Sequence, residues 1–180
     1  MTKPKAVLAM TSKEIREHAI AARGLAERGI ILAPVDFSDH SEAALIQAAK
    51  FAELIPATLI ALHVVHEPGE MPGYYSKLIK KKRVARLQDI AAEAFDGFMD
   101  RIIADNPSLD SLNEAARLMV TGLPVTRILE LVEHLDPIMV VMGSQGRTGL
   151  KHLVIGSKAA QIVQLCPVPV TIVKKKDDVD

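Results

Sequence analysis

The chain has 180 residues, more than the roughly 150 of one typical domain, which argues for a single compact domain with an extension. Lysine plus arginine and aspartate plus glutamate each total 22, so the formal net charge is zero and no global field attracts nucleic acid or acidic lipid. Aromatic residues make up only 3%, which predicts an aliphatic core, and a single cysteine excludes an intrachain disulfide and a four-cysteine zinc site.

Residues 1–29 lie outside the pattern of the remaining chain. The apolar run Ala6–Met10 is shorter than the hydrophobic region of a signal peptide. Thr11–Glu14 has the form of a capping box, and it is followed by small apolar residues at helical spacing up to Gly29. We expect an extra N-terminal helix here, packed on its own domain or on a dimer mate.

An alternation of short aliphatic runs and longer amphipathic segments begins at residue 30. Ile30–Val35 predicts a buried strand, and Asp36–Asp39 offers N-cap residues for a following helix. Thr58–Val65 predicts a second strand, and after a loop rich in proline and glycine a long helix is expected from about Ser76 to Ala104. The apolar stripe of this helix consists of Val84, Leu87, Ala91, Phe95, Phe98 and Ile102.

The same alternation continues to residue 173. The predicted elements are a strand at 115–120, a helix at 125–135, a strand at 138–142, a helix at 156–165 and a strand at 168–173. Strands separated by helices imply right-handed crossovers, so we predict an α/β fold with an open, doubly wound, five-stranded parallel sheet of Rossmann-like type. We expect residues 30–174 to form this domain and residues 175–180 a charged tail. Ligands of such sheets bind beyond the carboxyl ends of the strands.

A glycine-rich segment follows the fourth predicted strand. Gly143, Gly146 and Gly149 fall within seven positions, and glycine lets several backbone N–H groups approach one anion. Gly156-Ser157 begins a predicted helix, whose amino end favours phosphate, and Arg147, Lys151 and Lys158 add positive charge. These residues predict a polyphosphate cradle, with a glycine turn that binds nothing as the alternative. The spacing is neither that of a Walker loop nor that of a dinucleotide fingerprint.

The spacing from Gly143 to Ser157, G-x2-G-x9-G-S, resembles the nucleotide-binding signature of the ATP-binding universal stress proteins. The resemblance covers about residues 30 to 174, through the segments Ile31–Ser38, Leu62–Val64, Asp136–Met142 and Cys166–Val173. One departure is Gln145, where many relatives carry histidine, which puts a role of that side chain toward phosphate in doubt.

The resemblance implies an ATP site, with ADP and AMP left open, and Mg²⁺ on the phosphates. Adenine would lie against Pro34, Val35 and Val64, and the ribose would face Asp36 and Gly143. Asp36 follows the first strand and is also placed by the residue pattern for a sugar hydroxyl, with a plain helix-start acid as the alternative. The implied cofactor-binding residues are Pro34, Val35, Asp36, Val64, Met142, Gly143, Gly146, Arg147, Gly156, Ser157 and Lys158.

Other candidate residues carry weaker signals. His63 and His66 point to opposite faces of a strand, which disfavours a metal site, and Cys166 is interpreted as a small buried apolar residue. A basic patch is interpreted as a solvated helix face, with a nucleotide phosphate or an acidic partner as the alternative; it consists of Lys77, Lys80, Lys81, Lys82, Arg83 and Arg86.

The sequence therefore predicts a small cytoplasmic stress-response protein that binds ATP and acts through its shape or partners. It is not expected to be an enzyme, because no clear catalytic base is visible and any hydrolysis would be slow. The alternatives are a nucleotide-free dimeric module of the same family and an adenylating enzyme. As in the family, a homodimer is expected through the edge strand Val168–Val173, with a further protein partner unidentified. No run of about 18 apolar residues is present, so no membrane segment is expected.

Overall fold

A single parallel sheet organises the chain in the computed structural model, which describes residues 7–10, 29–66, 76–146 and 155–175. Its six strands have the order β1-β4-β3-β2-β5-β6, and each pairs parallel with its neighbours. The strands are β1 Val7–Met10, β2 Gly29–Val35, β3 Ala57–Val65, β4 Ala116–Thr121, β5 Met139–Gly143 and β6 Val170–Val173. The five predicted strands are thus confirmed, with shifts at their ends.

Strand β1 was not expected. It pairs with β4, with Val7 opposite Leu118 and Met10 opposite Val120, and so extends the sheet beyond its predicted edge. The apolar run Ala6–Met10 was compared only with a signal peptide, although a run of this length is also consistent with a buried strand. The predicted N-terminal helix falls in 11–28, outside the described residues.

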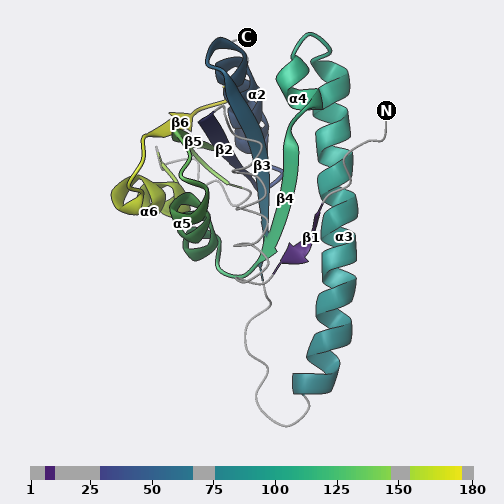
Figure 1. The fold of residues 1–180 in the computed structure, drawn as a ribbon. Helices are drawn as coiled ribbons and strands as arrows, with labels where there is room; N and C mark the ends of the chain where they lie inside the picture. The colour runs from purple at the N-terminus through teal and green to yellow at the C-terminus, as the bar shows by residue number, and fades with distance from the viewer. Residues whose placement is uncertain (1–6, 11–28, 67–75, 147–154, 176–180) are drawn as a thin grey trace.

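The helices cover both faces of the sheet (Figure 1). They are α2 Asp39–Leu54, α3 Ser76–Asp105, α4 Asp110–Asn113, α5 Pro124–Leu135 and α6 Ser157–Leu165, and the single-turn α4 was not predicted. Among these described helices, none is long and apolar enough to cross a membrane. The amino end of α3 extends past the carboxyl ends of the strands (Figure 1).

The two faces of the sheet carry separate hydrophobic cores. In β2, Ile31 and Ala33 pack with α2, α3 and α4, whereas Ile30 and Leu32 pack with α5 and α6. This alternation follows from the period of two in a strand. The predicted stripe of α3 is confirmed at Ala91, Phe95, Phe98 and Ile102, all of which are buried. This arrangement is the doubly wound fold that the sequence predicted.

A buried arginine joins β4 to α3. The Arg117 side chain is only 6% exposed, and it donates to Asp96 at 2.7 Å and to Asp100 at 2.9 Å. The two carboxylates, one helical turn apart on α3, neutralise a charge that would otherwise be buried alone. They therefore fix the position of α3 against the sheet.

We expect the double variant Asp96→Asn, Asp100→Asn to lower the free energy of unfolding by about 2–3 kcal/mol, because it leaves a buried guanidinium without opposite charge. Arg117→Met should cost less, about 1 kcal/mol, since an apolar side chain of similar length replaces the charge. Urea denaturation measures both changes. A larger loss in Arg117→Met than in the double variant would contradict this account.

Candidate functional site

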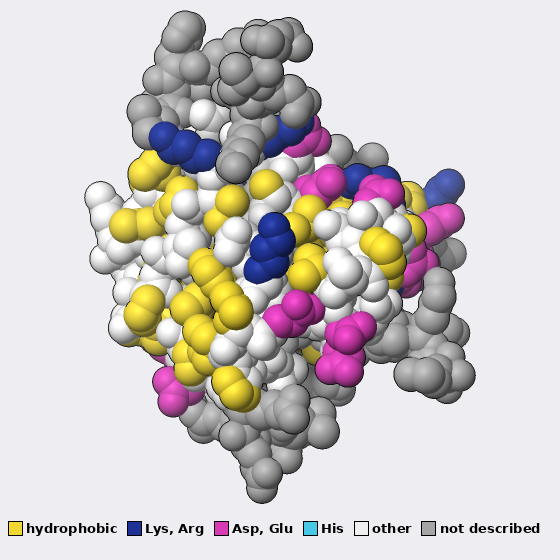
Figure 2. All heavy atoms as spheres, turned by 90° about the horizontal axis from the view of Figure 1, so that it is seen from above, with side chains coloured by type: hydrophobic (Ala, Val, Ile, Leu, Met, Phe, Trp, Pro, Cys, Tyr) yellow, Lys and Arg dark blue, Asp and Glu magenta, His cyan; other side chains and the backbone are white. Residues whose placement is uncertain are grey.

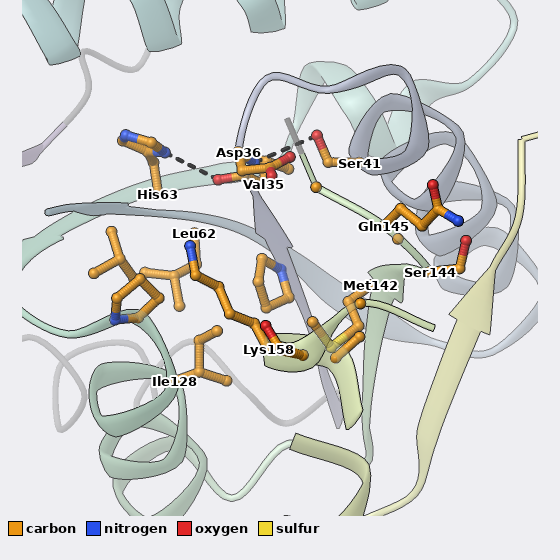
Figure 3. A pocket seen from close by; sticks show the side chains of 18 of the residues that line it. Val35, Asp36, Ser41, Leu62, His63, Ile128, Met142, Ser144, Gln145 and Lys158 are labelled. Atoms are coloured by element: carbon orange, nitrogen blue, oxygen red, sulfur yellow. Dashed lines mark hydrogen bonds between the residues drawn. The ribbon is translucent and has the colours of Figure 1, made fainter. Parts of the chain in front are cut away.

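A pocket of about 350 Å³ opens at the carboxyl ends of β2, β3 and β5, where α5 and α6 begin (Figure 3). Its volume is in the range of sites for small molecules. One part of the lining is apolar and includes Pro34, Leu62, Val64, Ile128 and Met142. The other part is polar and glycine-rich, so the pocket joins an apolar surface to hydrogen-bonding groups.

The structure brings the predicted site residues together around this one pocket. Those that line it are Pro34, Val35, Asp36, Val64, Met142, Gly143, Gly146, Gly156, Ser157 and Lys158. Arg147 lies outside the described residues, as do Gly149 and Lys151 of the glycine-rich segment.

Several lining residues were missed by the sequence analysis. Pro124 and Ile128 of α5 contribute to the pocket, and Ser41 of α2 does as well. The sequence prediction placed the site after the first, second and fourth predicted strands, although parallel strands all end at the same edge of a sheet. Applying the same rule to the 115–120 strand would have found the start of α5.

Asp36 occupies the turn between β2 and α2. Its Oδ1 accepts from the Ser38 hydroxyl at 2.6 Å and from the Ser38 backbone N–H at 3.2 Å. Its own backbone N–H donates to Ser41 Oγ at 3.3 Å. A Cβ added to Gly146 would lie 2.5 Å from Asp36 Oδ2, so the other carboxylate oxygen faces the glycine loop.

The N-cap of α2 is Ser38, whose hydroxyl accepts from the backbone N–H of Ser41 at 3.2 Å. Asp36 precedes the cap by two residues, and the acids of the first helical turn are Asp39 and Glu42. Asp36 thus contacts the N-cap residue of α2, as the alternative of a helix-start acid expects, although it lies outside the first helical turn. Its carboxylate belongs to the wall of the pocket.

Phe37, the next residue, has a left-handed backbone with φ of 65°. This conformation costs a non-glycine residue roughly 1–2 kcal/mol, so surrounding contacts must hold it. The ring of Phe37 stacks on His63 with centroids 4.2 Å apart, and it also contacts Phe98 at 5.3 Å. His63 Nδ1 donates to the backbone carbonyl of Val35 at 2.9 Å (Figure 3).

The amino end of α6 forms the opposite side of the pocket. Gly156 is the N-cap and offers no side chain to the free N–H groups of the first turn. Its own N–H donates to the carbonyl of Ser144 at 2.7 Å, which fixes the helix start against the end of β5. The Lys158 side chain extends from α6 into the pocket (Figure 3). Helix dipole and ammonium together favour an anion here.

Gly143 and Gly156 lack side chains for different reasons. A Cβ at Gly143 would lie 2.7 Å from the carbonyl carbon of His40, so β5 and α2 approach too closely for any other residue. Among the described residues, a Cβ at Gly156 would meet the Ser144 carbonyl oxygen at 3.4 Å and Gln145 Cα at 3.6 Å, and φ there is −68°. The packing of the described residues therefore requires glycine at 143 but not at 156.

Polar contacts tie the end of the described chain to the first turn of α2. The Lys175 ammonium donates to Asp39 at 2.6 Å and lowers the pKa of that carboxyl group. The Lys175 backbone N–H donates to His40 Nδ1, and the Ser144 hydroxyl lies 3.3 Å from the same nitrogen. Asp39 and Lys175 are largely solvated, so this link fixes geometry more than it adds stability.

Within the described ranges, no group of three histidine, cysteine, aspartate or glutamate side chains is arranged to hold a metal ion. His63 and His66 both line the pocket without forming such a group. Cys166 is half-buried and packs against the core cluster of α5 and α6. Of the basic patch predicted at 77–86, the structure describes the side chain of Arg86, which is exposed.

Comparison with known sequences gives one family. The sequence model of the family described as the universal stress protein family matches residues 27–174. The chain is 26% identical to the universal stress protein MJ0577 of Methanocaldococcus jannaschii over 163 residues, which cover 82% of this chain and 95% of that protein.

Comparison with solved structures gives the same fold. UspA from Lactobacillus plantarum matches with a TM-score of 0.67 at 24% identity, over 81% of this chain and 97% of that one. The solved structure of MJ0577 matches with a TM-score of 0.63 at 26% identity, over 83% of this chain and 98% of that one. A universal stress protein in complex with cAMP matches at 0.50 and 20% identity, over 82% and 97%.

We expect Gly143→Ala to lower the free energy of unfolding by about 1–3 kcal/mol, because the added Cβ forces α2 away from β5. The matched control is Gly97→Ala on α3, where a Cβ meets nothing within 4 Å. This control should stabilise by about 0.5–1 kcal/mol, since glycine is unfavourable inside a helix. Equal effects of the two substitutions in urea denaturation would show that Gly143 is not required for packing.

Proposed function

Because the chain belongs to the universal stress protein family, we propose that it is an ATP-binding member whose bound nucleotide controls its shape or its partners. ADP and AMP are the other ligands that a cradle built mainly from backbone groups would accept. The proposal rests on the pocket at the carboxyl ends of the strands and on the chemistry of the groups that line it.

The observation that carries the proposal is the glycine at position 156. Neither the backbone conformation nor the packing of the described residues requires a residue without a side chain there. The position nevertheless begins α6 at the wall of the pocket, where free N–H groups face an incoming anion. Close approach of a phosphate to the backbone explains the glycine.

The rest of the pocket suits the other parts of the nucleotide. An apolar surface that includes Pro34, Val64 and Ile128 fits a planar base, and the Asp36 carboxylate can accept from a sugar hydroxyl. The similar protein in complex with cAMP holds an adenine nucleotide in the same fold, which supports this class of ligand.

We propose binding without efficient turnover. Mg²⁺ takes oxygen ligands and retains several waters, so it would be held mainly by the nucleotide phosphates, with Asp36 as the nearby carboxylate. Efficient phosphoryl transfer also needs a positioned base or a group that orients water. In the part of the pocket that the structure describes, the polar groups of Asp36 and Ser41 are already engaged in the α2 turn.

We expect wild-type protein to bind Mg²⁺-ATP in the micromolar range in isothermal titration calorimetry, and Gly156→Val to lose at least about tenfold in affinity. The added methyl groups would occupy the space through which a phosphate reaches the first N–H groups of α6. An added Cβ at this position makes only ordinary van der Waals contacts with the described residues, and urea denaturation of the variant checks that it remains folded.

Gly97→Val is the matched control, because it adds the same side chain on α3, away from the pocket. It should bind ATP like the wild type. Absence of binding in the wild type would favour a nucleotide-free interaction module, and equal affinity of Gly156→Val and wild type would contradict the phosphate cradle.

We further propose that two copies associate through β6. This strand is the last in the sheet order, so one of its backbone edges has no neighbour within the described chain. Its residues Val170–Val173 are partly exposed and mostly apolar, which favours pairing with another strand. The alternative is that a strand of an unidentified protein partner pairs with this edge.

Analytical ultracentrifugation at micromolar concentration should give twice the 19.5 kDa mass of the chain. Thr171→Asp places a charge in the middle of the edge strand and should shift the protein to the monomer, while Glu130→Gln on α5 should leave the mass unchanged. A wild-type monomer would contradict association through β6, and so would a Thr171→Asp dimer.

A further inference from the structure

The turn after β2 contains backbone strain next to the proposed sugar site. Phe37 is one of two non-glycine residues with positive φ in the described ranges, and the other, Asp136, is the C-cap of α5. Asp136 has the ordinary role of ending a helix. A left-handed aromatic residue inside a turn has no such explanation, and strain of this kind concentrates at functional positions.

Aromatic contacts from outside the turn hold Phe37 in this conformation. Its ring contacts the stacked His63 ring at 4.2 Å and the rings of Phe98 at 5.3 Å and Phe95 at 6.1 Å, and His63 also contacts Phe95 at 6.0 Å. Phe95 and Phe98 belong to the buried stripe of α3, so their positions are fixed by the core. The strained residue is thus attached to a rigid part of the fold.

His63 fixes the strand end that precedes Asp36. Val35 and His63 are the last pair in the register between β2 and β3. The carbonyl of Val35 can only accept, so His63 Nδ1 carries the proton of their 2.9 Å hydrogen bond. The same ring then stacks on Phe37, so one side chain contacts both neighbours of Asp36.

Asp36 is held from both sides as a result. Its Oδ1 is engaged by Ser38, and its Oδ2 is directed at Gly146 across the pocket wall. A rotation at Phe37 would move the Ser38 N–H and hydroxyl groups that hold this carboxylate. The orientation of the acid therefore depends on two aromatic side chains, which act through its neighbours Val35 and Ser38.

We infer that Phe37 and His63 form a positioning pair that holds the Asp36 carboxylate for a sugar hydroxyl, and so sets the preference of the site for ribonucleotides over deoxyribonucleotides. The inference rests on the proposed function, because it assumes a nucleotide in this pocket. It assigns to the stack a role in selectivity beyond that of core packing.

Affinities for ATP, 2′-deoxyATP and 3′-deoxyATP test the pair. Wild type should prefer ATP over the analogue that lacks the contacted hydroxyl by about tenfold, the value of one hydrogen bond to a charged group. Asp36→Asn identifies that hydroxyl, because the preference should fall in this variant. Phe37→Gly, which accepts positive φ without the ring, and His63→Leu should both reduce the preference to below about threefold by weakening ATP alone.

Phe51→Ala is the matched control, since Phe51 is another half-buried phenylalanine on the same core cluster that does not line the pocket. It should retain the wild-type preference. If Phe37→Gly and His63→Leu weaken ATP and the deoxy analogue by the same factor, the pair is only structural and the inference is wrong.

Hydrogen exchange on nucleotide-free protein separates this inference from the proposed function. Exchange of the Ser38 amide, which donates to Asp36 Oδ1, should accelerate about tenfold in Phe37→Gly and remain unchanged in Phe51→Ala. Unchanged exchange in Phe37→Gly would contradict the positioning role alone. Failure of the wild type to bind any of the three nucleotides would contradict the proposed function and the sugar preference together.

Discussion

The central strand β2 is the constraint on which the rest of the structure depends. It pairs with β3 on one side and β5 on the other, and Ile31, Leu32 and Ala33 are fully buried. A strand covered on both faces cannot shift by one residue without exchanging the two cores, so its register is fixed. Its carboxyl end therefore delivers Val35 and Asp36 to one defined place, next to the ends of β3 and β5.

The pocket follows from this register. Chain reversals after β2 and β5 begin α2 and α6 on opposite faces, and the apolar lining comes from residues that continue the α5 and α6 core, such as Leu62 and Met142. The α2 and α3 core supplies the support instead, because Phe95 and Phe98 belong to it and contact Phe37. One core thus forms the floor of the pocket, and the other holds the turn that carries its acid.

Sequence patterns predicted the strands and the pocket residues, because these depend on local composition and residue spacing. Aliphatic runs located the five strands β2 to β6, and the glycine spacing located the residues that meet around the pocket, because both signals are local. The left-handed Phe37 could not be predicted, since its conformation is stabilised by rings from β3 and α3 that are distant in the sequence. The packing role of Gly143 was hidden for the same reason, because its neighbour is the backbone of His40.

Ser144 follows β5 and contacts both β6 and the start of α6 through its backbone. Its backbone N–H donates to the carbonyl of Val173 in β6 at 2.8 Å, and its carbonyl accepts from the N–H of Gly156 at 2.7 Å. The proposed phosphate contact and the proposed association edge are therefore separated by a single buried residue. If a ligand binds one arrangement of Gly156 more tightly, Ser144 is the residue through which that preference would reach Val173, and by linkage association at β6 would then favour the ligand.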